Sequence, residues 1–397
     1  MKINRISIKG YRSLKEIDWE PGSLNVVIGP NGTGKSNLLR FFELLVAASK
    51  GNLSSYIQKA GGIKPLLWDG KMDAFSFRLD LTLPSVNDDQ WEDDYSYEVL
   101  FRQMGSSGDY LVESECLTVQ NQNSLGIDDE PVKLLYRDKQ KIIIYDATGK
   151  EMDMPEDVVS HGELLLATAA NPISGSKQIN AFQKSLSSLA VYHDLFVHQD
   201  SLIRQPAVTR YENTVAADGQ NLVSVLHTLY TGDRNFKNAI DSSMRAAFGN
   251  EYEELVFPPA ADQRVQLRIR WSSLDQEQSA ADLSDGTIYF LLLMTILNNP
   301  RPPALIAIDE PETGLHPSML SVVAEHAVEI SCKAQVIFTT HSSQFLDAFA
   351  DVRPVTTVTS WQNGETRLKV LDGEELNYWL SSYTLGSLFV SGELENM

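Results

Sequence analysis

The sequence is poor in cysteine and in long apolar runs, and each shortage excludes a class of protein. Two cysteines in 397 residues, Cys116 and Cys332, have neither metal-site nor redox spacing, so a reducing, cytoplasmic compartment is expected. No apolar run reaches the roughly 18 to 20 residues that a membrane helix requires. We therefore expect a globular protein without membrane association. No long heptad pattern occurs either, which excludes a long coiled-coil arm.

Basic residues are also scarce. Lysine and arginine number 33 against 53 acidic residues, which gives a net charge of −20. A protein that binds duplex DNA directly usually has a basic face, because phosphate neutralisation supplies most of its nonspecific affinity. The basic spots that do occur are expected to be a solvated hairpin and a solvated sheet face: Lys133, Arg137, Lys139 and Lys141, and Arg264, Arg268 and Arg270. Contact with nucleic acid is therefore expected to be indirect, and direct DNA binding would require a dimeric groove or a partner.

A glycine-rich loop is the most informative feature that the sequence contains. It fits the pattern G-x-x-x-x-G-K-[ST] and reads Gly29-Pro30-Asn31-Gly32-Thr33-Gly34-Lys35-Ser36. The preceding residues 24–28 predict a buried strand, and residues 37–48 predict a helix. Glycines let backbone N–H groups point at phosphates, and the start of the helix adds partial positive charge. We predict an ATP site formed by Asn31, Gly32, Thr33, Gly34, Lys35, Ser36 and Asn37.

Within this site, Lys35 is predicted to reach the β- and γ-phosphates, and Ser36 to ligate Mg²⁺. A second pattern lies near the other end of the chain. Residues 304–308 are continuously apolar, as in a strand buried on both faces, and Asp309 and Glu310 follow. An acid at the end of such a strand can hold Mg²⁺, which predicts the Walker B role for Asp309. The adjacent Glu310 is predicted to polarise the attacking water.

Three shorter motifs surround these acids. Leu283-Ser284-Asp285-Gly286-Thr287 precedes an apolar helical pattern at residues 288–297. The phrase Pro311-Glu312-Thr313-Gly314-Leu315-His316-Pro317 follows the acids directly. Residues 336–340 predict another buried strand, and His341 stands at its end.

Taken in this order, the motifs resemble those of ABC-type ATPases, and within them the soluble RecF/SMC/OLD-like branch of AAA-family ATPases. Leu283 follows Ser36 by 247 residues, whereas transporter ATPases place their signature much closer to the phosphate loop. The phrase Gly10-Tyr11-Arg12-Ser13-Leu14 also resembles the soluble branch, and Asp218-Gly219-Gln220-Asn221-Leu222 resembles it in the middle of the chain. The C-terminal residues, from Trp379-Leu380 to Gly392-Glu393-Leu394, resemble short bacterial members that are often encoded beside a small partner.

The resemblance implies roles for further residues. Two heads sandwich two ATP molecules in this family, so Ser284, Asp285 and Gly286 would contact the nucleotide of a second copy. His341 would be the switch histidine, which completes a catalytic set with Lys35 and Glu310. The family also uses a Q-loop glutamine, for which Gln58, Gln178 and Gln183 are candidates by position only.

The predicted fold is α/β: a P-loop ABC-type head with a mixed β-sheet core, an antiparallel β-subdomain and a mostly helical lobe. The expected boundaries are residues 1–150 for the first half of the head, 151–260 for the helical lobe and 261–397 for the second half.

The expected function is an ATP-hydrolysing switch that forms a homodimer or higher oligomer through ATP. It would control a separate effector, a nuclease or toxin, in a bacterial anti-phage defence or nucleic-acid maintenance complex. No segment that resembles a TOPRIM or HNH nuclease follows the head, which favours a separate effector. Two alternatives remain: a transporter ATPase subunit, which the long spacing disfavours, and a noncatalytic scaffold, which the presence of Lys35, Asp309 and Glu310 disfavours.

Overall fold

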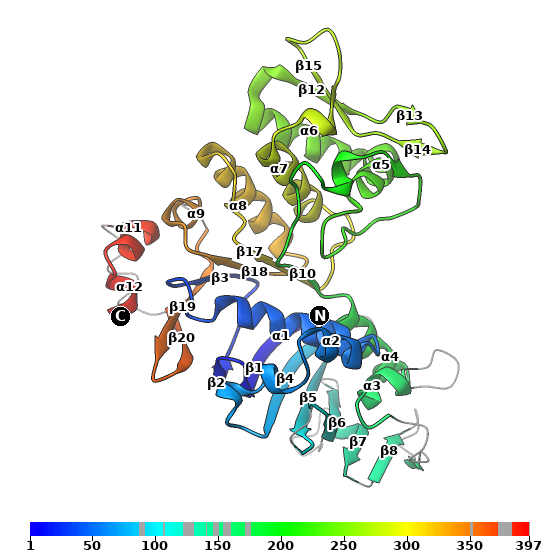
Figure 1. Ribbon diagram of the computed structural model, residues 1–397, viewed down its shortest axis with the longest axis vertical. Helices are drawn as coiled ribbons and strands as arrows, with labels where there is room; N and C mark the ends of the chain where they lie inside the picture. The colour runs from blue at the N-terminus through cyan, green and yellow to red at the C-terminus, as the bar shows by residue number, and fades with distance from the viewer. Residues whose placement is uncertain are drawn as a thin grey trace. The chain divides into compact units, whose positions relative to one another are not determined.

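The computed structural model describes residues 1–86, 92–105, 108–121, 131–139, 141–145, 151–153, 160–170, 176–349, 352–371 and 383–396. The chain divides into two compact units, which are described separately (Figure 1). The first consists of Met1–Gly22, Ile28–Leu189 and Thr357–Val370, and the second of Ser23–Val27, Ala190–Thr356 and Leu371–Met397. None of the helices in the described ranges is long and apolar enough to cross a membrane.

The first unit is built on an eight-stranded antiparallel sheet with the order β2-β1-β4-β5-β6-β7-β8-β9. The strands are β1 (Lys2–Tyr11), β2 (Leu14–Trp19), β4 (Ala74–Pro84), β5 (Glu92–Gln103), β6 (Tyr110–Asn121), β7 (Val132–Asp138), β8 (Lys141–Tyr145) and β9 (Glu151–Asp153). Apolar side chains alternate along β4, so one face of this strand is buried. The predicted antiparallel β-subdomain corresponds to this sheet.

Helices pack against the buried face of this sheet. They are α1 (Lys35–Ser49), α2 (Leu53–Lys59), α3 (Leu165–Ala169) and α4 (Lys177–Ser187), with short 3₁₀ turns η1 (Lys64–Leu66) and η2 (Trp68–Gly70). Phe41 of α1 anchors the contact, because its ring lies 5.9 Å from that of Tyr11 and 5.3 Å from that of Phe77. A hairpin of β19 (Val355–Gln362) and β20 (Glu365–Leu371) belongs largely to the same unit.

One basic residue of this unit differs from the expectation of a solvated hairpin. Arg137 on β7 is only 4% exposed, and its guanidinium donates to the backbone oxygens of Glu163 (2.8 Å) and Ser160 (2.9 Å). Lys139 and Lys141, at the turn of the same hairpin, are exposed. The prediction was therefore wrong for Arg137, because its side chain satisfies carbonyl groups of the segment that leads into α3.

The second unit contains parallel strands whose carboxyl ends meet at one edge. Their order is β10 (Ala190–Tyr192), β17 (Leu305–Asp309), β18 (Gln335–Thr340) and β3 (Leu24–Ile28). The pairs β10–β17 and β17–β18 are parallel, and the Val336 N–H donates to the Ser23 oxygen next to β3 (2.8 Å). The buried strands predicted near residues 24–28, 304–308 and 336–340 are therefore present within one residue.

Helices α5 (Leu222–Gly232), α6 (Arg234–Phe248), α7 (Asp285–Leu297) and α8 (Pro317–Ser331) form a contacting group in this unit (Figure 1). Every residue of α7 from Thr287 onward is buried, as expected for a helix that is apolar on all sides. Two small sheets accompany the helices: β11 (Ala207–Val208) with β14 (Arg264–Val265) and β13 (Pro259–Ala260), and β12 (Tyr252–Val256) with β15 (Arg268–Trp271) and β16 (Gln278–Ser279).

The remaining helices of the unit are α9 (Ser343–Asp347), α11 (Leu385–Val390) and α12 (Glu393–Asn396), and its 3₁₀ turns are η4 (Leu202–Arg204), η5 (Gly249–Glu251) and η6 (Ala280–Asp282). The expected helical lobe at residues 151–260 is divided at Leu189, so α3 and α4 fall in the first unit and α5 and α6 in the second. The family-like residues Trp379 and Leu380 lie outside the described ranges.

Candidate active site

The glycine loop precedes α1 and has the backbone conformation that its sequence predicts. Gly29, Gly32 and Gly34 all have positive φ angles, of 151°, 82° and 101°. Gly34 is the N-cap residue of α1, and a Cβ atom at this position would lie 2.1 Å from the Thr366 hydroxyl oxygen. Only glycine therefore fits here, both for the left-handed backbone and for the close approach of β20.

The side chain of Lys35 is folded over the loop. It is 6% exposed, and its Nζ atom donates to the backbone oxygens of Gly29 (2.6 Å) and Pro30 (3.1 Å). Asn31 and Gly32 are exposed at the tip, and Ser36 is half-buried in the first turn of α1. The loop thus combines an ammonium group, exposed backbone and the N-terminus of a helix. These groups together are suited to binding phosphate.

Hydroxyl groups from other strands brace the loop. The Thr33 hydroxyl lies 2.6 Å from that of Thr359 on β19, and the Thr366 hydroxyl donates to the Thr33 backbone oxygen (2.8 Å). Ser13, at the turn between β1 and β2, accepts from the Asn37 side-chain amide (2.7 Å). The phrase Gly10-Tyr11-Arg12-Ser13-Leu14 thus supports the glycine loop through Ser13, a contact between segments far apart in the sequence.

In the second unit, Asp309 ends β17, and its carboxylate contacts two polar side chains. Its side chain is 13% exposed, and its Oδ2 atom lies 2.7 Å from Nδ1 of His193, the residue after β10. The Thr339 hydroxyl on β18 donates to the other carboxylate oxygen. His193 was not identified from the sequence; the only available indication was its position after the short apolar run of β10.

Glu310 follows Asp309 with a strained backbone. Its φ angle is 45°, which is uncommon for a residue other than glycine and occurs often at functional sites. Its Oε1 atom lies 3.0 Å from Nδ1 of His341, the residue after β18. Glu310 and His341 are 38% and 47% exposed, so solvent reaches both side chains. The two predicted catalytic residues of this unit are therefore in contact.

Glu312 is a third acid in this region that the sequence analysis assigned only to a motif. Its Oε1 atom accepts from the Thr340 hydroxyl (2.5 Å) and the His341 backbone N–H (3.4 Å). Its Oε2 atom is buried and has no hydrogen-bond partner among the described residues. Burial raises the pKa of the Glu312 carboxyl above its ordinary value. Glu312 thus holds the backbone from which His341 projects.

The signature-like motif forms the start of α7. Ser284 is exposed and is the N-cap residue, because its hydroxyl accepts from the Thr287 N–H (3.1 Å). Gly286 contacts the turn after Glu310, where a Cβ atom at Gly286 would lie 2.6 Å from the Gly314 oxygen. His316, in the motif at residues 311–317, caps α8 by accepting from the Ser318 N–H (3.3 Å). The signature-like motif and the motif at residues 311–317 are therefore neighbours.

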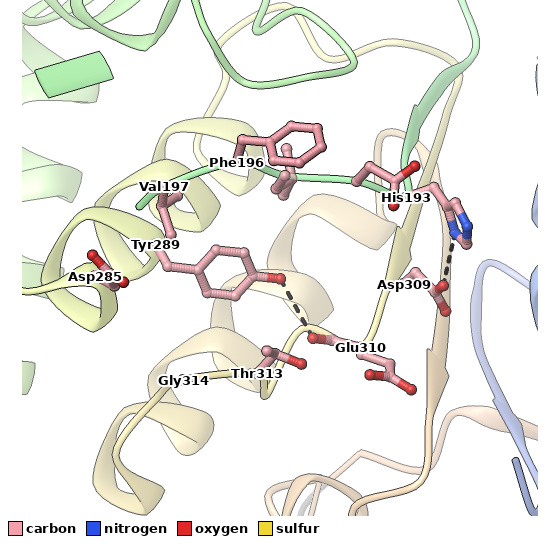
Figure 2. A pocket seen from close by; sticks show the side chains of 11 residues that line it. His193, Phe196, Val197, Asp285, Tyr289, Asp309, Glu310, Thr313 and Gly314 are labelled. Atoms are coloured by element: carbon pink, nitrogen blue, oxygen red, sulfur yellow. Dashed lines mark hydrogen bonds and ion pairs between the residues drawn. The ribbon is translucent and has the colours of Figure 1, made fainter. Parts of the chain in front are cut away.

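A cavity of about 400 Å³ joins these motifs within the second unit (Figure 2). Figure 2 shows His193 and Asp309 on one side and Asp285 on the opposite side, with the Tyr289 ring between them. The Tyr289 hydroxyl donates to the Glu310 backbone oxygen (3.4 Å), and burial raises its pKa, so the hydroxyl stays protonated. Tyr289 was also missed from the sequence, where it appeared as one apolar position of a helix.

The predicted residues thus form two groups, each in its own unit. The first unit contains Asn31, Gly32, Thr33, Gly34, Lys35, Ser36 and Asn37, and the second contains Ser284, Asp285, Gly286, Asp309, Glu310 and His341. Of the three glutamines considered for the Q-loop, Gln183 donates to the Ser49 oxygen (2.7 Å) and Gln178 accepts from the Ser176 hydroxyl (2.8 Å). Both contacts stay within the helices and segments beside α1, so neither glutamine is assigned to the Q-loop.

Solved structures similar to this chain include SMC heads. One, an SMC head bound to the C-winged helix domain of ScpA, has a TM-score of 0.57 and 12% identity, covering 95% of this chain and all of that one. Another, a Pyrococcus furiosus SMC head with an extended coiled coil bound to the C-terminal domain of ScpA, has a TM-score of 0.53 and 12% identity, covering 96% and 98%. These likenesses confirm the predicted fold class.

Comparisons of the sequence with known proteins also find relatives. An OLD nuclease of Thermus scotoductus is 22% identical over 364 residues, which cover 87% of this chain. The chain spans 60% of the length of that protein. A family model described as "AAA domain, putative AbiEii toxin, Type IV TA system" matches residues 24–347. Because this match covers well over half of the chain, the protein belongs to that AAA-domain family, and its fold resembles that of SMC heads.

Proposed function

We propose that this chain is an ATP-hydrolysing switch subunit that dimerises through ATP and controls a separate effector. The observation that carries the proposal is the grouping of Asp309, Glu310 and His341 at one edge of the parallel strands, with Glu310 3.0 Å from His341. An acid pair beside an imidazole suits the activation of water, whereas a purely structural ATP site does not require it.

The glycine loop and Asp309 fit Mg²⁺·ATP by their chemistry. The exposed backbone at Gly32, the buried Nζ of Lys35 and the start of α1 together favour a triphosphate. Ser36 in the first unit and Asp309 in the second each carry an oxygen atom of the type that Mg²⁺ prefers as a ligand. When bound, Mg²⁺ neutralises charge on the phosphate oxygens. This chain's own contribution is to hold the nucleotide and to keep the Asp309 carboxylate oriented through Thr339 and His193.

Glu310 is the proposed general base. Its carboxylate can accept a proton from a water molecule, and His341 can fix the orientation of that carboxylate through its Nδ1 atom. Glu312 supports this arrangement indirectly, since it holds the His341 backbone N–H and the Thr340 hydroxyl. In the proposal, Glu310 performs the proton transfer, while His341 and Glu312 position it.

The proposed dimer uses the start of α7. Ser284 and Asp285 are exposed, and Gly286 is half-buried beside Gly314, so the motif offers hydroxyl and backbone groups to a second copy. ATP stabilises such a dimer because it adds contacts only in the closed state. The SMC-head likeness supports the fold on which this arrangement depends.

A substitution at Ser284 tests the dimer. The variant Ser284→Arg is expected to bind ATP nearly as well as the unmodified chain but to lose ATP-driven association, because a long cation replaces the small hydroxyl at the contact. Association is measured by light scattering in the Glu310→Gln background, where ATP persists. Ser321→Arg, at an exposed position of α8, is the control and should associate normally. Equal ATP-driven association in the Ser284→Arg, Glu310→Gln double variant would contradict the trans contact.

The proposed output lies in a separate protein, in the context of anti-phage defence or nucleic-acid maintenance. In the proposal Asp309 and Glu310 serve the ATP site, and among the described residues no group of three or more His, Cys, Asp or Glu side chains is placed to hold a metal ion. The matched relative is an OLD nuclease that this chain spans only in part, which makes nuclease activity of this chain the competing proposal.

A nuclease assay separates the two proposals. Highly purified chain, incubated with ATP and Mg²⁺ or Mn²⁺, is expected to leave plasmid, linear duplex and single-stranded DNA intact over hours. Cleavage is measured by gel analysis of the substrates. A parallel reaction with a known trace amount of nuclease sets the smallest amount of cleavage that can be detected. Cleavage that persists in both Lys35→Ala and Glu310→Gln would establish a second active site in this chain.

A further inference from the structure

The guanidinium of Arg204 joins two loops that border the cavity of the second unit. Arg204 ends the turn η4, and its side chain is only 4% exposed. Its Nε atom donates to the backbone oxygens of Val197 (3.0 Å) and His198 (3.1 Å). These two residues belong to the loop that follows β10 and contains His193. One end of the arginine therefore holds the loop that contacts Asp309.

The other two nitrogens of the Arg204 guanidinium bind the segment that leads into α7. Nη1 donates to the backbone oxygens of Ala280 (3.0 Å) and Leu283 (2.6 Å), and Nη2 donates to the Asp285 carboxylate. Leu283 and Asp285 flank Ser284, the N-cap residue of α7. A planar guanidinium with five fixed donors can satisfy both loops at once, which a lysine cannot do. The position of Ser284 is thus set from both sides by one buried side chain.

The phrase Asp218-Gly219-Gln220-Asn221-Leu222 braces the same loop. The Gln220 side chain donates to the Phe196 oxygen (2.8 Å) and accepts from the Ser201 hydroxyl (2.9 Å) and the Leu202 N–H (2.8 Å). Gly219 has a φ angle of 74°, and a Cβ atom there would lie 3.1 Å from Leu292 of α7. This motif therefore fastens residues 193–204, called here the bridge segment, close to α7.

The bridge segment connects the two ends of the cavity. At its start, His193 Nδ1 lies 2.7 Å from Asp309 Oδ2, and at its end Arg204 binds the start of α7. Asp309 and the start of α7 are therefore joined through one segment of chain that forms polar contacts at both of its ends. A contiguous path of this kind shows where coupling can pass, and a coupling measurement decides whether it does.

We propose that Arg204 is a positioning residue that couples the Asp309 end of the site to the signature turn at residues 283–286. The inference rests on the proposed ATP-driven dimer, because the signature turn is the surface that meets the second copy. Arg204 contacts neither nucleotide nor water in this role. It keeps Ser284 and Gly286 in the arrangement that the nucleotide of the other head requires.

A double-mutant cycle between Arg204→Gln and Asp285→Asn tests the inference. Each single variant is expected to weaken ATP-driven association by about five- to a hundredfold, with unchanged affinity of the separate head for a fluorescent ATP analogue. The double variant is expected to be no weaker than the worse single variant, because both changes break one connection. Arg204→Lys should not restore association. Arg245→Gln removes an exposed arginine of α6 with one backbone contact and serves as the matched control.

Amide hydrogen exchange provides a second measurement that needs no dimer. In Asp285→Asn, faster exchange is expected at residues 284–287 and also at residues 196–199, although the substituted side chain is 58% exposed and lies outside the second loop. Because this measurement uses Asp285→Asn, it tests the connection between the two loops even if Arg204→Gln fails to fold. Additive effects in the cycle, or faster exchange confined to α7, would overturn the inference. Absence of ATP-driven association in the unmodified chain would instead refute the proposed function, while the exchange result would still test the connection.

Discussion

Replacing Glu310 with glutamine is expected to lower ATP turnover by about 10²- to 10⁴-fold, the usual effect of removing a general base. Binding of ATP and Mg²⁺ should remain, because glutamine preserves the shape of the side chain and Asp309 and the glycine loop are unchanged. The contact with His341 at 3.0 Å lies beside the reacting position and does not form the phosphate-binding loop. Phosphate release and the binding of a fluorescent ATP analogue, measured on the same preparation, separate the two effects.

The control for this result is Glu325→Gln, at an exposed position of α8. It removes the same charge without touching the site, so turnover should match that of the unmodified chain. Turnover near the unmodified rate in Glu310→Gln would refute its assignment as the base. If the unmodified chain binds ATP but shows no turnover under any condition, the noncatalytic scaffold becomes the better interpretation of the site.

Replacing Lys35 with alanine is expected to weaken nucleotide binding itself, whereas Glu310→Gln is expected to slow only hydrolysis. A hydrogen bond to a charged group contributes about 1.5 to 3 kcal/mol, so the affinity for ATP is expected to fall by about ten- to a hundredfold. Lys35 is 6% exposed, and its Nζ atom lies over the loop at 2.6 Å from the Gly29 oxygen. Titration of the fluorescent analogue into the variant measures the change directly.

Two observations check the origin of that loss. Lys50→Ala, just beyond the end of α1, removes an exposed lysine and should leave the affinity unchanged. Thermal unfolding of Lys35→Ala without nucleotide should resemble that of the unmodified chain, since the loop is also held by Thr33, Thr359 and Thr366. An unaltered ATP affinity in Lys35→Ala would count against a phosphate-binding role for the glycine loop.

The alternative that this chain is the ATPase subunit of a transporter is tested by identifying its partner proteins. The long separation between Ser36 and Leu283 favours the SMC- and OLD-like branch, and the family match and the SMC-head likeness agree with it. Identification of the proteins that co-purify with the native chain distinguishes an effector from a membrane subunit.

Local patterns were sufficient for much of the architecture. The buried strands β3, β17 and β18 were predictable because continuous apolar runs of this length bury both faces of a strand. The glycine loop and the start of α7 were predictable as well, since a left-handed backbone requires glycine and a helix start favours a serine N-cap. Each of these features depends on residues close together in the chain.

Contacts between distant segments were not predictable in the same way. His193 meets Asp309 only because β10 pairs with β17, and Arg204 reaches Leu283 only because the loop after β10 folds onto the start of α7. The burial of Arg137 similarly depends on the carbonyl groups of a segment that lies beyond β9. An isolated histidine or arginine has no periodicity or spacing from which such a partner could be inferred.

The sequence by itself therefore predicted the class of chemistry, because phosphate binding and water activation require particular residues at short spacings around Lys35, Asp309 and Glu310. It also determined the family, since these motifs occur in a particular order. Only the tertiary structure decided which side chains support them. The polar contacts of Thr366, His193, Glu312 and Arg204 act over a few ångströms, and chain folding alone brings groups separated by tens or hundreds of residues to that distance.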